Sequence, residues 1–154
     1  MLKGKKRWWL IGTIAAVILL SIAWYLGSPL FIDKTVNEEI SSTAVLSHSG
    51  TFSGADSFHQ VQGEAMAVSF NGKKYLRFED FQSTNGPDLK VYLSKDLEAK
   101  EYISLGDLKG NIGNQNYELQ DNVDLEDYKY ILIWCERFSV LFGNAELKGF
   151  PIVY

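Results

Sequence analysis

The sequence predicts an all-β domain, an antiparallel β-sandwich or jelly-roll-like barrel, behind one N-terminal transmembrane helix. Three observations support this prediction. The uncharged apolar run at 8–26 spans about 28 Å as a helix, which is close to the hydrocarbon thickness of a bilayer. Beyond it, short apolar runs alternate with turn residues such as Asn71-Gly72, a pair typical of tight hairpins. Within 89–94, apolar and polar residues alternate with the period of a half-buried strand.

The first element has the marks of a membrane anchor. A basic segment at 1–7 precedes the predicted transmembrane helix at 8–27, and aromatic residues stand at both ends of the run: Trp8, Trp9, Trp24 and Tyr25. Basic residues flank only the N-terminal side, so we expect the N-terminus in the cytoplasm and the rest of the chain outside. The alternative is a cleaved secretory signal with its cleavage site near Gly27 or Ser28, although the apolar run ends in bulky residues rather than in a small-x-small site.

The remainder divides into a short linker and one domain. Gly27–Pro29 should end the helix, residues 33–43 are polar, and we interpret 28–43 as a linker. Residues 44–154 form the predicted extracytoplasmic β domain. The Gly-Asn pairs at 110–111, 113–114 and 143–144 are interpreted as further separators between strands. The predicted strands are 44–53, 64–71, 74–78, 89–94, 101–106, 116–119, 129–136 and 139–148.

Charge excludes one class of partner. The chain has 15 basic and 19 acidic residues, and four of the basic ones precede the apolar run. The rest therefore carries 11 basic against 19 acidic residues, a net charge of −8. Nucleic-acid binding is excluded, because neutralisation of phosphates supplies most of the affinity in such complexes.

Cys135 is the single cysteine, so no intrachain disulfide can support the domain. It ends the run YILIWC at 130–135, which is apolar on both faces and suits a central strand. In a strand, Ile131, Ile133 and Cys135 point to one face, and Tyr130, Leu132 and Trp134 point to the other.

Four ordered stretches together resemble the DM13 domain family. They are GTFSGADSFHQVQGEA at 50–65, NGPDLKVYLS at 85–94, GNIGNQNYEL at 110–119 and YILIWCERFSVLFGNAEL at 130–147. The resemblance covers roughly residues 45–150. It implies an all-β fold, export, and electron transfer through the cysteine, here Cys135, as a bare thiol or as a ligand to a prosthetic group such as haem.

Two residues are candidates for a site. Cys135 is a redox thiol or a ligand if Arg137 favours its thiolate, although Glu136 opposes this effect; otherwise it is a small buried hydrophobe. His59, in the turn-like segment ADSFHQVQG, either ligates a metal together with Cys135 or orients the thiol, or else bonds a neighbouring backbone group. One cysteine and two histidines cannot form a closed zinc site without carboxylates, and no covalent haem motif is present.

Three functions stay open at this stage. The protein is a membrane-anchored redox accessory with a protein or small-thiol partner, a binding module without chemistry, or a structural envelope protein with an inert cysteine. A one-thiol protein forms only mixed or intermolecular disulfides, so the first function requires a partner. For the second function, the candidate contact patch consists of Trp134, Tyr117, Tyr128 and Tyr130.

Overall fold

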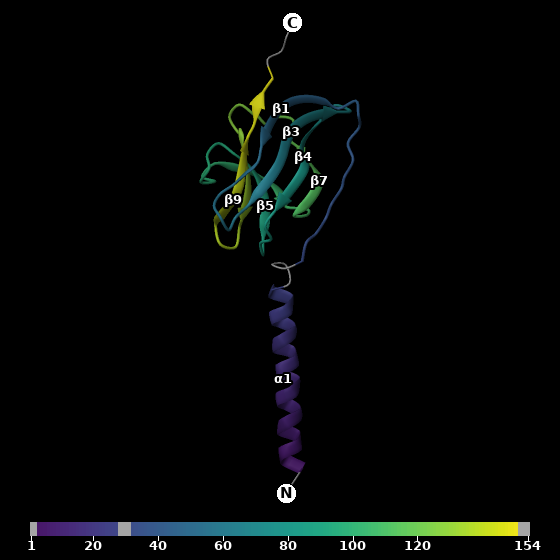
Figure 1. Ribbon diagram of the computed structural model, residues 1–154, viewed down its shortest axis with the longest axis vertical. Coiled ribbons are helices and arrows are strands. Elements are labelled where there is room, and N and C mark those ends of the chain that lie inside the picture. The colour runs from purple at the N-terminus through teal and green to yellow at the C-terminus, as the bar shows by residue number, and fades with distance from the viewer. Residues whose placement is uncertain (1–2, 28–31, 151–154) are drawn as a thin grey trace.

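A computed structural model describes residues 3–27 and 32–150, as one long helix and a separate β domain (Figure 1). The helix α1 spans Lys3–Gly27 and therefore begins ahead of the predicted transmembrane segment. Its apolar stretch Trp8–Tyr25 is long enough to cross a membrane, and none of that stretch is buried against the domain. Gly27, the first residue of the predicted stop Gly27–Pro29, is the last described residue of the helix; residues 1–2, 28–31 and 151–154 lie outside the described part of the chain.

The domain is an antiparallel β-sandwich, as predicted. One sheet has the order β10-β1-β3-β4-β7 and the other β2-β9-β8-β5-β6. The strands are β1 Val45–Thr51, β2 Ser53–Gly54, β3 Val61–Phe70, β4 Lys73–Ser83, β5 Leu89–Ser94, β6 Tyr102–Asp107, β7 Ile112–Leu119, β8 Tyr130–Cys135, β9 Val140–Glu146 and β10 Lys148–Gly149.

Strand β8 lies at the centre of its sheet, between β5 and β9, which explains why it is apolar on both faces. Ile131, Ile133 and Cys135 belong to the core between the sheets, as predicted. On the outer face Leu132 is also fully buried, while Tyr130 and Trp134 are half-buried. Opposite, the core is filled by contacting aromatic rings, with centroids 4.9 to 5.2 Å apart among Phe52, Phe78 and Phe81.

The Gly-Asn and Asn-Gly pairs have different roles. Asn71-Gly72 forms the predicted turn between β3 and β4, with positive φ angles of 50° and 75°. The prediction that 113–114 and 143–144 separate strands is wrong, because both pairs lie within strands. Gly113 has φ of 102° opposite a register shift in β4. At Gly143, a Cβ would lie 2.6 Å from the Ser53 carbonyl oxygen, so glycine permits β2 to pair closely with β9.

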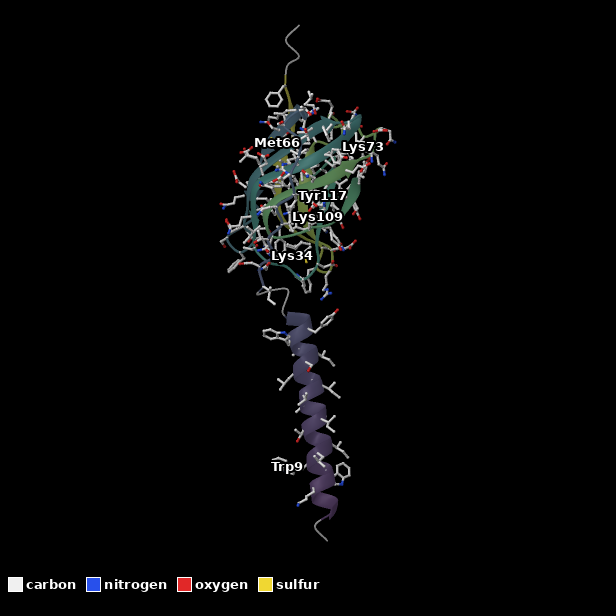
Figure 2. All side chains as sticks on the ribbon, turned by 90° about the vertical axis from the view of Figure 1, so that its right-hand side faces the viewer. Trp9, Lys34, Met66, Lys73, Lys109 and Tyr117 are labelled. Atoms are coloured by element: carbon white, nitrogen blue, oxygen red, sulfur yellow. The ribbon has the colours of Figure 1, made fainter. Side chains whose placement is uncertain are left out.

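Four turns meet at the end of the sandwich nearest α1, which we call the tether end: 55–60, 84–88, 108–111 and 136–139 (Figure 1). Backbone hydrogen bonds join them. The Thr84 N–H donates to the Gln60 carbonyl (2.9 Å), and the Glu136 N–H donates to the Asp88 carbonyl (3.0 Å). Figure 2 shows Lys34 at this end and Lys73 toward the opposite one.

The segment predicted as a linker is partly docked on the domain. Residues 33–39, which we call the tether segment, run parallel to β7 and form a bridge between Thr35 and Ile112. The Val36 N–H donates to the Ile112 carbonyl (2.9 Å), and the Glu38 N–H donates to the Asn114 carbonyl (2.8 Å). At the tether end, the Asp33 carboxylate accepts hydrogen bonds from two asparagine side chains, Asn85 (2.9 Å) and Asn111 (2.8 Å).

Candidate functional site

Cys135 is the last residue of β8, and its side chain lies in the core, close to the tether end. Its backbone is paired with Leu89 of β5 and Val140 of β9. The exposed fraction of Cys135 is 0%, and the residue carries a free thiol. The exposed 136–139 turn directly follows this strand end along the chain. The sulfur is therefore enclosed in the native state, and it lies one residue from an exposed turn.

The charged residues that follow Cys135 do not enclose it. Glu136 and Arg137 are both exposed in the 136–139 turn. The Glu136 carboxylate accepts a hydrogen bond from the Tyr92 hydroxyl (3.3 Å) and lies 3.7 Å from the Lys90 ammonium. Glu136 therefore joins the outer face of the sheet, whereas Cys135 faces the core.

His59 is held by contacts within its own loop and with β9. Its Nδ1 lies 2.7 Å from the Asp56 carboxylate, whose other oxygen accepts the N–H groups of Phe58 and His59. The hydrogen bonds from His59, first that of its side chain, lower the pKa of Asp56 to about 2. The His59 ring packs on Phe142, with centroids 4.4 Å apart. These contacts fix the 55–60 turn, and within the described residues no hydrogen bond joins His59 to Cys135.

The aromatic residues considered as a contact patch are not equivalent. Tyr117 is buried in the core, and its hydroxyl donates to Gln115 Oε1 (2.8 Å). Tyr128 is packed against the core, with the Lys95 ammonium 5.1 Å from its ring centroid. Tyr130 and Trp134 remain half-buried on the outer face of the β8 sheet. A patch of all four aromatic residues is therefore excluded.

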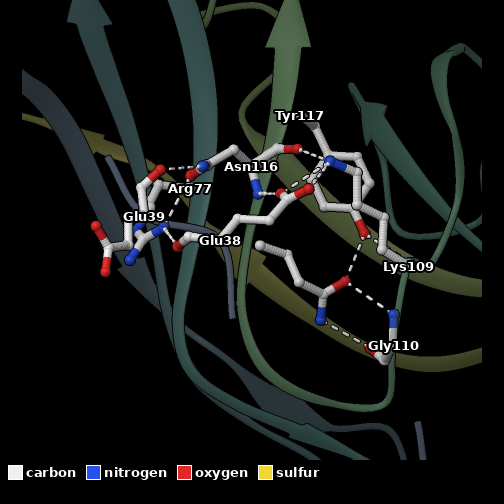
Figure 3. Close-up of polar contacts among 8 residues, drawn as sticks. Glu38, Glu39, Arg77, Lys109, Gly110, Asn116 and Tyr117 are labelled. Atoms are coloured by element: carbon white, nitrogen blue, oxygen red, sulfur yellow. Dashed lines mark hydrogen bonds and ion pairs between the residues drawn. The ribbon is translucent and has the colours of Figure 1, made fainter. Parts of the chain in front are cut away.

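A polar network that the sequence analysis did not predict joins the tether segment to the domain (Figure 3). The Lys109 ammonium donates to both carboxylate oxygens of Glu38 (2.7 and 2.8 Å) and to the Asn116 carbonyl (2.7 Å). The Asn116 N–H donates to Glu38 as well (2.7 Å). Arg77, only 5% exposed, donates to the Glu38 carbonyl (2.6 Å) and the Asn116 side chain (3.0 Å). The tether segment lies 39 to 78 residues along the chain from its partners Arg77, Lys109 and Asn116, so no local motif indicates the network.

A second layer of the network lies deeper. The Lys109 N–H donates to the Tyr117 hydroxyl (3.0 Å), and the buried Gln115 side chain forms two hydrogen bonds with the backbone of Gly110. Burial raises the pKa of Tyr117 above its ordinary value. Burial also acts to raise the pKa of Glu38, but the hydrogen bonds from Lys109 and the Asn116 N–H outweigh it and lower that pKa. All of these groups are paired, which indicates a structural role in docking the tether segment.

The surroundings of Cys135 do not fit haem. A haem ligated by this sulfur would need an open face beside it, whereas the thiol packs among the apolar core residues between the sheets. Three surface hollows on the domain, of about 440, 570 and 470 Å³, are lined by other residues. Among the described residues there is no group of three or more His, Cys, Asp and Glu side chains that could hold a metal ion.

Fold and site together define a class of protein. It is a small β-sandwich with one buried thiol, and it follows a helix that is long and apolar enough to cross a membrane. The chain belongs to the DM13 family, because the family model described as "Electron transfer DM13" matches residues 51–147, more than half of its length. No curated protein and no solved structure matches the chain.

Proposed function

We propose that this protein is a single-pass membrane protein whose extracytoplasmic β domain takes part in electron transfer through Cys135. The observation that carries the redox part is the match to an electron-transfer family over 51–147, a range that contains the single thiol of the chain. The family description does not name a partner. The proposal is therefore limited to the role of the Cys135 thiol and to the location of the protein.

The location is supported by α1. Its apolar stretch is uncharged and solvent-exposed, with Trp8 and Trp9 at one end and Trp24 near the other. The basic cluster stands only at the N-terminal end, which favours a cytoplasmic N-terminus. Added protease should digest the β domain in vesicles whose extracytoplasmic side faces outward. It should leave the domain intact in vesicles of the opposite orientation. A soluble mature form that begins near residue 28 would instead identify α1 as a cleaved signal.

The chemistry supported by a lone thiol is exchange with a partner disulfide. The Cys135 thiolate attacks one partner sulfur, the partner S–S bond breaks, and a mixed disulfide forms while the second partner sulfur leaves as a thiolate. A small thiol from solution then attacks the partner's sulfur in the mixed disulfide, forms a new disulfide with it, and releases Cys135 as a thiolate. Cys135 is thus oxidised in the first step and reduced in the second.

Burial requires that this chemistry proceed through local opening. Cys135 forms the last register pair before the 136–139 turn, and the Ser139 N–H is 3.4 Å from the Glu136 carbonyl, a long hydrogen bond. Separation of this terminal pair exposes the sulfur without unfolding the sandwich, because strand ends open at lower free energy than strand centres. The proposed reactive state is the sandwich with an open 136–139 turn.

The alternative is a structural or binding module with an inert cysteine, and the full burial of Cys135 favours it. The two functions differ in how Cys135 is reached. Local opening should slow alkylation by roughly a thousandfold or less relative to an exposed thiol, whereas access only through global unfolding slows it by at least about ten-thousandfold. The exposed reference is the Arg137→Cys variant in a Cys135→Ala background, two residues along the same chain.

The measurement uses the full chain in detergent, with iodoacetamide and intact mass as the readout. A protection factor below about a thousand, together with release of one thiolate per chain from an aromatic disulfide, is the expected result. If the protection factor of Cys135 equals the equilibrium constant of global folding, measured in parallel by urea titration, then electron transfer through this thiol is refuted and the inert module stands.

A further inference from the structure

We infer that the tether end of the domain docks on the lipid surface of the membrane that holds α1, by inserting the side chains of Phe58 and Phe138. This inference goes beyond electron transfer and rests on retention of α1 in the membrane. It begins from the exposed fractions of the two side chains, 82% for Phe58 and 65% for Phe138, the two highest among the aromatic side chains of residues 32–150.

Both phenylalanines belong to turns at the tether end. Phe58 lies in the 55–60 turn, and Phe138 lies in the 136–139 turn. The two turns are neighbours along β9: Phe138 precedes the start of that strand, and the Ala55 N–H donates to the Phe142 carbonyl (2.9 Å). The two exposed rings are therefore carried on adjacent turns at one end of the sandwich, the end nearest α1 in Figure 1.

The turn that carries Phe58 is fixed. The Asp56 carboxylate accepts the Phe58 N–H (2.7 Å) and binds the His59 ring, which in turn packs on Phe142. These contacts hold the turn on the sandwich and leave the Phe58 side chain in solvent. An exposed aromatic ring on an ordered turn loses little conformational freedom on insertion, so the position is suited to a membrane interface, where aromatic side chains are enriched.

The tether supplies the argument for lipid as the occupant. Five residues, 28–32, separate Gly27 at the end of α1 from Asp33, which is bound to Asn85 and Asn111 at the tether end. The six steps along the chain from Gly27 to Asp33 reach at most about 20 Å, so the tether end is confined close to the bilayer. Confinement on this scale gives a high effective concentration, and a contact too weak to bind a free domain becomes populated.

The charges of the tether end specify the kind of lipid surface. At the tether end the acidic residues outnumber the basic ones: they are Asp33, Asp56, Asp88, Asp107 and Glu136 against Lys34, Lys90 and Arg137. The whole chain beyond the basic segment is also acidic. Attraction to anionic headgroups therefore contributes little, unlike in polybasic membrane-binding segments. The chemistry is apolar insertion into a neutral surface, and we expect it to be insensitive to salt.

The test uses the full chain with Cys135→Ala in phosphatidylcholine vesicles, with an environment-sensitive fluorophore on one introduced thiol. Ser57→Cys places the label beside Phe58, and Asn122→Cys places it in the exposed 120–129 loop at the opposite end. The expected result is blue-shifted emission at position 57 and quenching by lipids that carry a nitroxide near the headgroup, with neither effect at position 122. Both effects should persist in high salt.

Matched substitutions assign the effect to the two rings. Phe58→Ser with Phe138→Ser should abolish most of the quenching at position 57, whereas Phe150→Ser, at an exposed phenylalanine beyond β10, should leave it unchanged. Circular dichroism verifies that these surface variants are folded. Equal quenching at positions 57 and 122, or quenching that survives the double substitution, would overturn the inference. Failure of the chain to float with the vesicles would refute the anchor itself, whereas the thiol chemistry of Cys135 is measured separately in detergent.

Discussion

Replacement of Glu38 by alanine should uncouple the tether segment from the sandwich. The substitution removes the carboxylate, so the Lys109 ammonium loses two hydrogen-bond acceptors and the Asn116 N–H loses its acceptor. The Glu38 and Lys109 side chains are 36% and 39% exposed, so water replaces much of the ion pair, which is worth about 0–1 kcal/mol. The part-buried amide adds about 1–2 kcal/mol. We expect the free energy of unfolding to fall by about 2 kcal/mol.

The assay is thermal and urea unfolding of the full chain in detergent, followed by circular dichroism of the strands. A loss of about 2 kcal/mol lowers the melting temperature by about 8 °C and the urea midpoint by about 1 M. The matched control is Glu39→Ala, because that exposed neighbour contributes its backbone carbonyl to Asn116. A Glu38→Ala variant within about 0.5 kcal/mol of the control would refute the reasoning.

The same carboxylate predicts a dependence on pH. Because folding lowers the pKa of Glu38, its contribution is complete above the ordinary value of 4.5 and is lost as the pH falls through the folded-state pKa. The stability difference between the wild-type chain and Glu38→Gln should therefore shrink as the pH falls below about 4.5. A difference that stays constant down to pH 3 would show that the ionised form contributes nothing.

Two further substitutions test the core and the backbone. Cys135→Ala should lower the free energy of unfolding by about 1–2 kcal/mol. Cys135→Ser should lower it further, although serine is closer to cysteine in shape, because it places a hydroxyl in the apolar core. A serine variant more stable than the alanine variant in urea titration would indicate polar surroundings. Gly63→Ala should lower the free energy of unfolding by more than about 2 kcal/mol, because its φ is +114° and the Cβ would lie 2.7 Å from the Glu79 carbonyl oxygen. Gly72→Ala should lower it by only about 1 kcal/mol, because its φ is +75° but no atom lies close to the added Cβ. Similar melting temperatures for the two glycine variants would refute the role of the close contact.

The fold was largely predictable because its signals are local. The alternation at 89–94 and the Asn71-Gly72 turn indicate strands and hairpins within a few residues, and both features are present. Cys135 was assigned to the face of Ile131 and Ile133 by the same period of two. At Gly113 and Gly143 the local signal was misleading, because tertiary contacts across the sheets, rather than turns, require glycine there.

The arrangement of the site was less predictable because it depends on contacts distant in sequence. Phe142, on which the His59 ring packs, is more than 80 residues away along the chain, so no local pattern near His59 indicates this contact. Likewise, the polar composition of 33–39 is that of a solvated linker, and only the distant Lys109 and Asn116 convert it into a docked segment. The prediction of a linker between 28 and 43 describes its composition and leaves out this docking.

The position of the tether segment has a consequence for association with other chains. β7 is an edge strand, and the outermost strand of any open sheet offers unpaired N–H and C=O groups to a neighbouring polypeptide. Here the hydrogen bonds of Val36 and Glu38 to β7 occupy part of that edge from within the same molecule. A fragment cut at residue 44 would retain the family-matched region but bare the edge, and we expect it to aggregate through strand addition, whereas one that begins at residue 32 would stay monomeric.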